Sequence, residues 1–133
     1  MFEKNVLIVG NDGIRGALMR IMREYGYKVL EASNGKRALE VIRGDKELDL
    51  VITDQGGMSV LNGLGLIYQL RKPANDMPNN IPVILLCDNL KPAEQSELQQ
   101  YGNVQLLQKP FLDSTLIGAI KAIVALRREL EVA

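Results

Sequence analysis

The sequence contains no histidine and only one cysteine among its 133 residues. Without histidine, the chain cannot form a histidine-based catalytic triad or a histidine-ligated zinc site, and it cannot itself carry a phosphohistidine. The single thiol, Cys87, excludes a disulfide within the chain and is typical of a reducing compartment. We therefore expect a cytoplasmic location.

The sequence also lacks an excess of charge of either sign, because it has 16 Lys plus Arg and 16 Asp plus Glu. A net charge of zero argues against a broad nucleic-acid footprint and against binding to an anionic membrane. No apolar run approaches the ~18 residues of a membrane span, and no stretch resembles a signal peptide. We expect neither a nucleic acid nor a membrane as a partner.

The length predicts a single domain over residues 1–133, and a hydrophobic fraction of 47% is enough for one sizeable core. The hydrophobic pattern alternates strands with helices. Strands are expected at residues 5–9, 27–32, 50–54, 81–86 and 104–108, with helices at about 14–25, 36–43, 62–71, 91–100 and 112–130. This alternation predicts a parallel sheet with helices on both faces.

The carboxyl ends of parallel strands share one edge of a sheet, and four residues with useful chemistry each follow a different strand: Asp12, Asp54, Cys87 and Lys109. Asp54 ends the most apolar strand and precedes a glycine pair, Gly56 and Gly57. A carboxylate in this place can bind a divalent metal or act as a nucleophile. A simple turn aspartate is the alternative for Asp54 taken alone.

Five segments, in order and at nearly the right spacing, resemble the response-regulator receiver domain of two-component signalling over about residues 4–128. They are Val6-Leu7-Ile8-Val9, Tyr25-Gly26-Tyr27-Lys28-Val29, Asp49-Leu50-Val51-Ile52-Thr53-Asp54, Ile81-Pro82-Val83-Ile84 and Lys109-Pro110-Phe111. The resemblance implies an α/β fold of the flavodoxin-like, doubly wound type, with five parallel strands in the order 2-1-3-4-5 and five helices.

The resemblance also implies roles for individual residues. Asp54 matches the aspartate that accepts a phosphoryl group from a histidine kinase or phosphotransfer protein, and Lys109 matches the lysine that pairs with the phosphoryl oxygens. Mg²⁺ is expected at Asp54, Asp12 and a backbone carbonyl near Gly56. Cys87 stands at the threonine or serine position of the activation switch. Phosphoryl transfer of this kind depends on charge neutralisation and positioning, which these residue types can supply.

The loop after the first strand departs from the family, which usually has two adjacent acids there. This chain has Gly10-Asn11-Asp12 and is one residue short before Arg15. A gap after Asp12 aligns Asn11 and Asp12 with the acidic pair, whereas an earlier gap leaves Gly10 and Asn11 in those places. We prefer the first placement, which keeps one metal carboxylate and predicts weak Mg²⁺ binding.

Three further departures from the family lie elsewhere in the chain. The loop after Asp54 is one residue longer than usual, which affects the expected carbonyl ligand. Cys87 has a thiol, a poor hydrogen-bond donor, in place of a hydroxyl. Leu106 replaces the tyrosine or phenylalanine of the switch. The last two changes weaken the coupling between the site and the output face.

We therefore expect a receiver domain that is phosphorylated on Asp54 and relays the signal by conformational change or partner binding. The alternative is a phosphorylation-independent pseudo-receiver that acts as a protein-interaction module. A small flavodoxin-like enzyme is disfavoured, because neither a phosphate-binding loop nor an acid–base pair is visible, so at most Mg²⁺-dependent self-phosphorylation and dephosphorylation are expected. A homodimer through the last strand and helices is a further expectation.

Overall fold

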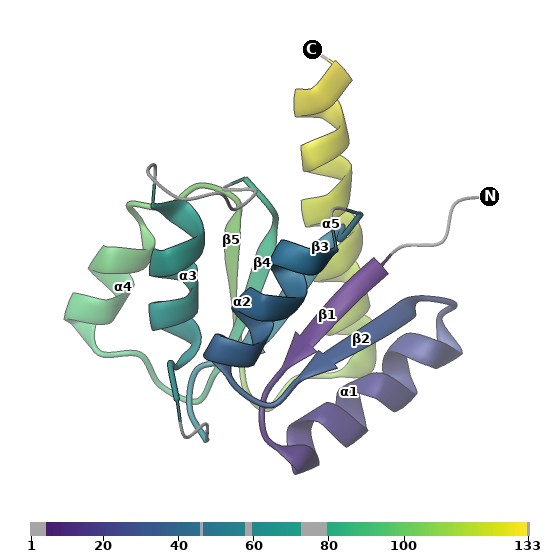
Figure 1. The fold of residues 1–133 in the computed structure, drawn as a ribbon, viewed down its shortest axis with the longest axis horizontal. Coiled ribbons are helices and arrows are strands. Elements are labelled where there is room, and N and C mark those ends of the chain that lie inside the picture. The colour runs from purple at the N-terminus through teal and green to yellow at the C-terminus, as the bar shows by residue number, and fades with distance from the viewer. Residues whose placement is uncertain (1–4, 46, 58–59, 73–79, 133) are drawn as a thin grey trace.

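The computed structural model describes residues 5–45, 47–57, 60–72 and 80–132, with side chains through residue 125. The elements alternate along the chain (Figure 1): β1 (Asn5–Val9), α1 (Asp12–Glu24), β2 (Lys28–Ala32), α2 (Gly35–Gly44), β3 (Leu50–Asp54), α3 (Gly63–Arg71), β4 (Val83–Cys87), α4 (Pro92–Leu98), β5 (Val104–Gln108) and α5 (Asp113–Val132). The five strands form one parallel sheet in the order β2-β1-β3-β4-β5, which confirms the predicted topology.

The register of the central strands decides which residues meet at the carboxyl edge. Val9 at the end of β1 pairs with Thr53 of β3, and Asp54 pairs with Leu86 of β4. Because side chains alternate between the two faces of a strand, Ile52 and Asp54 belong to one face of the sheet, and Val51 and Thr53 belong to the other.

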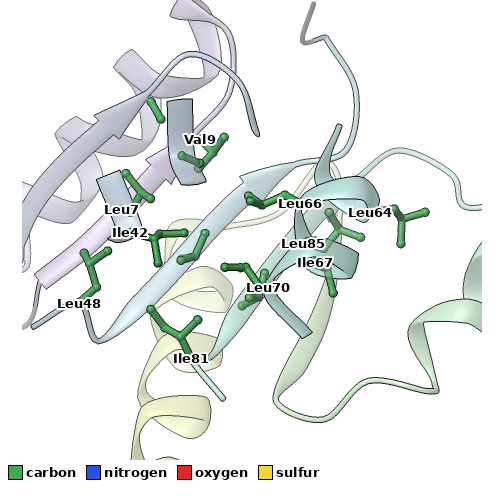
Figure 2. Close-up of a cluster of buried hydrophobic side chains, with 14 of the residues drawn as sticks. Leu7, Val9, Ile42, Leu48, Leu64, Leu66, Ile67, Leu70, Ile81 and Leu85 are labelled. Carbon is green, nitrogen blue, oxygen red and sulfur yellow. The ribbon is translucent and has the colours of Figure 1, made fainter. Parts of the chain in front are cut away.

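Two hydrophobic clusters cover the two faces of the sheet. Helices α2, α3 and α4 pack on one face, where Leu7, Val9 and Leu85 are buried with Ile42 and Leu66 (Figure 2). Helices α1 and α5 cover the opposite face. The buried residues there include Val6, Ile8, Leu50, Ile52, Met22, Leu116 and Ile120. Apolar side chains therefore occupy both faces of the central strands, which is why β3 and β4 are buried at every position.

Asparagine caps begin three of the helices. The side-chain oxygens of Asn11, Asn34 and Asn62 accept hydrogen bonds from the third residue along, at 3.1, 3.0 and 2.9 Å. Such a cap satisfies one of the unpaired N–H groups of the first turn and contributes about 1 kcal/mol. At the other end of α1, Gly26 has a φ of 84°, which suits the predicted glycine stop.

Several elements begin or end one or two residues from their expected bounds. β4 begins at Val83 rather than at residue 81, because Pro82 has no N–H, although its carbonyl still accepts from the Val51 N–H at 3.0 Å. The sequence predicts that Gly102 caps α4, but the left-handed residue there is Asn103, with a φ of 58°. The polar, proline-bearing stretch at 72–80 is predicted to be a surface loop, and it falls largely on residues 73–79, outside the described residues.

Among the described residues, no helix combines the length and the apolar character needed to cross a bilayer.

Candidate functional site

Asp54 is the last residue of β3 and lies at the carboxyl edge of the sheet with only 5% of its surface exposed. Burial of a charged carboxylate is costly unless a partner balances it. The partner is Lys109, directly after β5, whose Nζ lies 2.7 Å from Asp54 Oδ1. The structure thus brings together two of the predicted site residues from different strands.

The contact between Asp54 and Lys109 is an ion pair rather than a well-formed hydrogen bond. The buried Oδ1 receives no hydrogen bond from any described residue. The Lys109 N–H donates to the Cys87 carbonyl at 2.7 Å, which ties the Lys109 backbone to the end of β4. The bond from Lys109 to Pro110 is cis.

Cys87 ends β4 beside this pair. Its side chain is buried in the cluster beneath α2, α3 and α4. Burial raises the pKa of the Cys87 thiol, and the neighbouring Asp88 carboxylate raises it further, whereas Lys109 acts in the opposite direction. A raised pKa keeps the thiol neutral at physiological pH, so Cys87 is a poor nucleophile in this environment.

Asp12 lies in the first turn of α1, and its side chain is 98% exposed. Its carboxylate pairs with the guanidinium of Arg15. Arg15 also pairs with Glu31 at 3.0 Å and donates from Nε to the Gly10 carbonyl at 2.9 Å. The structure therefore directs Asp12 to Arg15 and not to Asp54, although the sequence predicted Asp12 as a metal ligand.

Gly10 and Asn11 occupy the space beside the site instead. A Cβ atom placed on Gly10 would lie 3.5 Å from the Cβ of Asp54, and one placed on Gly57 would lie 2.7 Å from Asn11 Nδ2. This geometry matches the second placement of the gap, with Gly10 and Asn11 where the family has its acids. Gly10 was not among the predicted site residues, although its position one residue past β1 was a usable signal.

The loop after β3 is organised by Gln55, which sequence analysis also missed. The Gln55 N–H donates to the Leu86 carbonyl at 2.9 Å, and its side-chain oxygen accepts from the Leu64 N–H at 2.8 Å. These bonds tie the loop to β4 and to the start of α3. Gly57 has a φ of 73°, and Gly56 is exposed, while residues 58–59 lie outside the described residues. The role of the Gly56 carbonyl as a ligand stays a prediction.

The oxygen atoms around Asp54 offer few ligands for a magnesium ion. Mg²⁺ prefers oxygen ligands and usually takes one or two carboxylates together with phosphate oxygens. Within the described ranges, no group of three Asp, Glu, Cys or His side chains could hold a metal ion. Asp54 is the carboxylate that the geometry places at the site, and Lys109 already balances its charge. The donor set therefore suits weak binding at most.

Leu106, the predicted departure at the aromatic position of the activation switch, lies in β5. Leu106 is 40% exposed and borders a cavity of about 280 Å³ that is also lined by Gln95, Leu98, Gln99, Tyr101 and Val104. The cavity lies between α4 and β5, next to the position where the family has an aromatic switch residue. A larger side chain at position 106 would have space to turn toward it.

A family model for the response regulator receiver domain matches residues 6–121. The two-component response regulator ORR3 of Oryza sativa is 30% identical over 109 residues, which are 81% of each chain. Among solved structures, chemotaxis protein CheY4 of Vibrio cholerae is similar with a TM-score of 0.80 and 24% identity, and the match covers 92% of this chain and 99% of that one.

A second solved structure is the receiver domain of a sensor histidine kinase from Pseudomonas aeruginosa, which has a magnesium ion coordinated in its active-site cleft. It has a TM-score of 0.79 and 21% identity to this chain, covering 93% of this chain and 99% of that one. At these identities, the two solved structures show the fold alone.

A five-stranded parallel sheet with a buried aspartate and a paired lysine at its carboxyl edge defines the class of two-component signalling modules. Together with the family match over most of its length, this shows that the chain belongs to the response regulator receiver domain family.

Proposed function

We propose that Asp54 accepts a phosphoryl group from a histidine kinase or a phosphotransfer protein. The observation that supports this most directly is the Asp54–Lys109 pair: a nearly buried carboxylate at the sheet edge, with an ammonium 2.7 Å away. A nucleophile for phosphoryl transfer needs a fixed position and a nearby cation more than it needs an acid–base partner. Both features are present without any histidine in this chain.

In the proposed step, a carboxylate oxygen of Asp54 attacks the phosphorus of a phosphohistidine on the donor. A P–O bond forms, the P–N bond breaks, and its electron pair leaves with the donor imidazole. The product is an acyl phosphate on Asp54. The Lys109 ammonium moves its pairing from the consumed carboxylate charge to the phosphoryl oxygens, where it stabilises the developing negative charge.

Magnesium enters this proposal as a weakly bound ion. When bound, Mg²⁺ would supply further positive charge at the transferred group. We propose that Asp54 and a backbone carbonyl near Gly56 would hold the ion. Membership of the response regulator receiver domain family supports a sensor histidine kinase or a phosphotransfer protein as the donor. A single domain over residues 1–133 and a cytoplasmic location belong to the same proposal.

Intact-mass spectrometry after incubation with acetyl phosphate tests phosphoryl acceptance. We expect one phosphoryl group on the wild-type protein and none on Asp54→Asn, and the adduct should be lost under alkaline conditions, as acyl phosphates are. Asp88→Asn is the matched control, because Asp88 is exposed and directly follows β4, the strand next to β3. If the wild type gains no mass while remaining folded, the phosphorylation-independent alternative is the correct one.

We also propose that the surface formed by α4, β5 and α5 is where the domain meets a second copy or a signalling partner. Leu106 is an exposed apolar residue on this surface and borders the cavity between α4 and β5. Sedimentation velocity with and without beryllofluoride tests the homodimer, with Leu106→Gln as the interface variant and Val60→Gln, an exposed apolar residue elsewhere, as its control. A wild type that remains monomeric at high concentration in both states would rule out the homodimer.

A further inference from the structure

The metal that the family implies does not match the donors that this chain offers. The mismatch lies in the loop after β1, where Gly10 and Asn11 stand in place of the family's two acids and the Asn11 side-chain oxygen caps α1. Gly10 follows β1 directly and is buried beside Asp54. A side chain at position 10 would start 3.5 Å from the Cβ of Asp54. Continuing the β1–β3 register past the Val9–Thr53 pair places Gly10 next to Asp54 on the same face of the sheet. Gly10 is therefore the position from which a second carboxylate would reach the site.

Asp12 does not replace the missing carboxylate. It is already part of α1, it points to solvent, and it is engaged by Arg15. Arg15 joins Asp12, Glu31 and the Gly10 carbonyl, so the loop between β1 and α1 is held by a guanidinium. A loop held in this way needs no metal ion to fix its conformation.

We infer that the metal affinity of the Asp54 site is decided at position 10, and that Asp12 takes no part in it. Each carboxylate added near a divalent cation strengthens binding, and Mg²⁺ commonly uses two of them. With glycine at position 10, Asp54 faces Lys109 instead of a second carboxylate, and Mg²⁺ binding is weak. The inference relies on the proposed function only for the assignment of Asp54 as the site.

Magnesium titration of four single variants tests the inference, with amide chemical shifts of the residues around Asp54 and Lys109 as the readout. Gly10→Asp should bind Mg²⁺ at least about tenfold more tightly than the wild type, whereas the isosteric Gly10→Asn should not. Asp12→Asn should leave the affinity within about twofold of wild type. Arg15→Gln, which releases Asp12, should also leave it unchanged.

The substitution at position 10 needs space, since its Cβ would meet the Cγ2 methyl of Ile14. This methyl is bonded directly to the Ile14 Cβ, and χ1 of isoleucine is stiff, so the Ile14 side chain or its backbone must shift. If Gly10→Asp does not fold, the pair Gly10→Asp/Ile14→Ala is compared with Gly10→Asn/Ile14→Ala. Equal affinities of the Asp and Asn variants would overturn the inference, and so would tighter binding in Arg15→Gln or weaker binding in Asp12→Asn. Failure of Asp54 to be phosphorylated would show in the mass experiment and leave these affinities as they are.

Discussion

Lys109 and Asp54 form an ion pair in which the two residues are unequally buried. The Asp54 side chain is 6% exposed and the Lys109 side chain is 24% exposed, while Nζ and Oδ1 lie 2.7 Å apart. Lys109 retains access to water, whereas Asp54 has little. Loss of either partner should therefore have different consequences for stability and for function.

The first prediction concerns this asymmetry. Lys109→Met should destabilise the protein by about 2 kcal/mol, because it leaves a buried carboxylate without a cation, although partial exposure of the site reduces the penalty. Asp54→Asn should cost less, since the lysine that remains is partly hydrated. The double variant should recover part of the loss seen in Lys109→Met. Urea unfolding measures all three, and equal losses in the two single variants would contradict the unequal burial.

The second prediction concerns coupling between the site and the β5 face. Beryllofluoride, used as a phosphate mimic, should shift amides near Asp54 and Lys109 but leave those near Leu106 almost unmoved. A ligand shifts a two-state equilibrium only as far as it interacts differently with the two states, and Cys87 and Leu106 offer little difference. Restoring Cys87→Thr together with Leu106→Tyr should enlarge the response, because the new ring has a cavity beside it.

Amide chemical-shift mapping decides this prediction, and the single variant Leu106→Met serves as the control for repacking alone. Large shifts across the β5 face of the unmodified protein would show that the coupling survives by another route.

The third prediction concerns the Cys87 thiol, whose pKa is raised chiefly by burial. At pH 8, a thiol reagent should label Cys87 at least about tenfold more slowly in the folded protein than in urea. Because the pKa of Cys87 is raised in the folded state, the neutral thiol contributes to stability. This contribution is fully present below about pH 8.5, the ordinary pKa of a thiol, and it is lost as the pH rises through the folded-state pKa.

The matched control for this prediction is Cys87→Ala. The free energy of unfolding is measured for this variant and for the wild type at pH values below and above about 8.5, and the difference between the two proteins is compared. That difference should become less favourable to the wild type above about pH 8.5. A constant difference, or labelling as rapid as in urea, would mean that the thiol is not protected as described.

The fourth prediction concerns Arg71, the last residue of α3. Its guanidinium donates to the backbone carbonyls of Gly102 at 3.1 Å and Ile81 at 2.6 Å, and so links α3 to the segments that lead into β4 and β5. Burial lowers the pKa of Arg71 to about 10, which leaves it charged at pH 7. Arg71→Lys should destabilise the protein by about 2 kcal/mol, because a lysine cannot span both carbonyls with a planar fork.

Arg43→Lys, an exposed change in the last turn of α2, should shift the free energy of unfolding by less than about 0.5 kcal/mol and serves as the control. Similar losses in the two variants, measured by urea unfolding, would show that the bonds of Arg71 contribute little.

The sequence by itself determined the fold. Apolar, β-branched strands alternate with amphipathic helices, and this local pattern permits few arrangements other than a parallel sheet covered on both faces. The strands at 5–9, 50–54 and 104–108 have the bounds that were predicted. The pairing of Asp54 with Lys109 was also foreseeable, because each of them follows a strand at the same edge.

The tertiary structure alone decided which residue of the Gly10-Asn11-Asp12 loop stands beside Asp54. The sequence allowed two placements of the missing residue, and they differ by a shift of one position. Two things in the folded chain separate them: the register of β1 on β3, which puts Gly10 next to Asp54, and the guanidinium of Arg15, which engages Asp12. Both depend on contacts between segments far apart in the chain, and local propensity contains no information about such contacts.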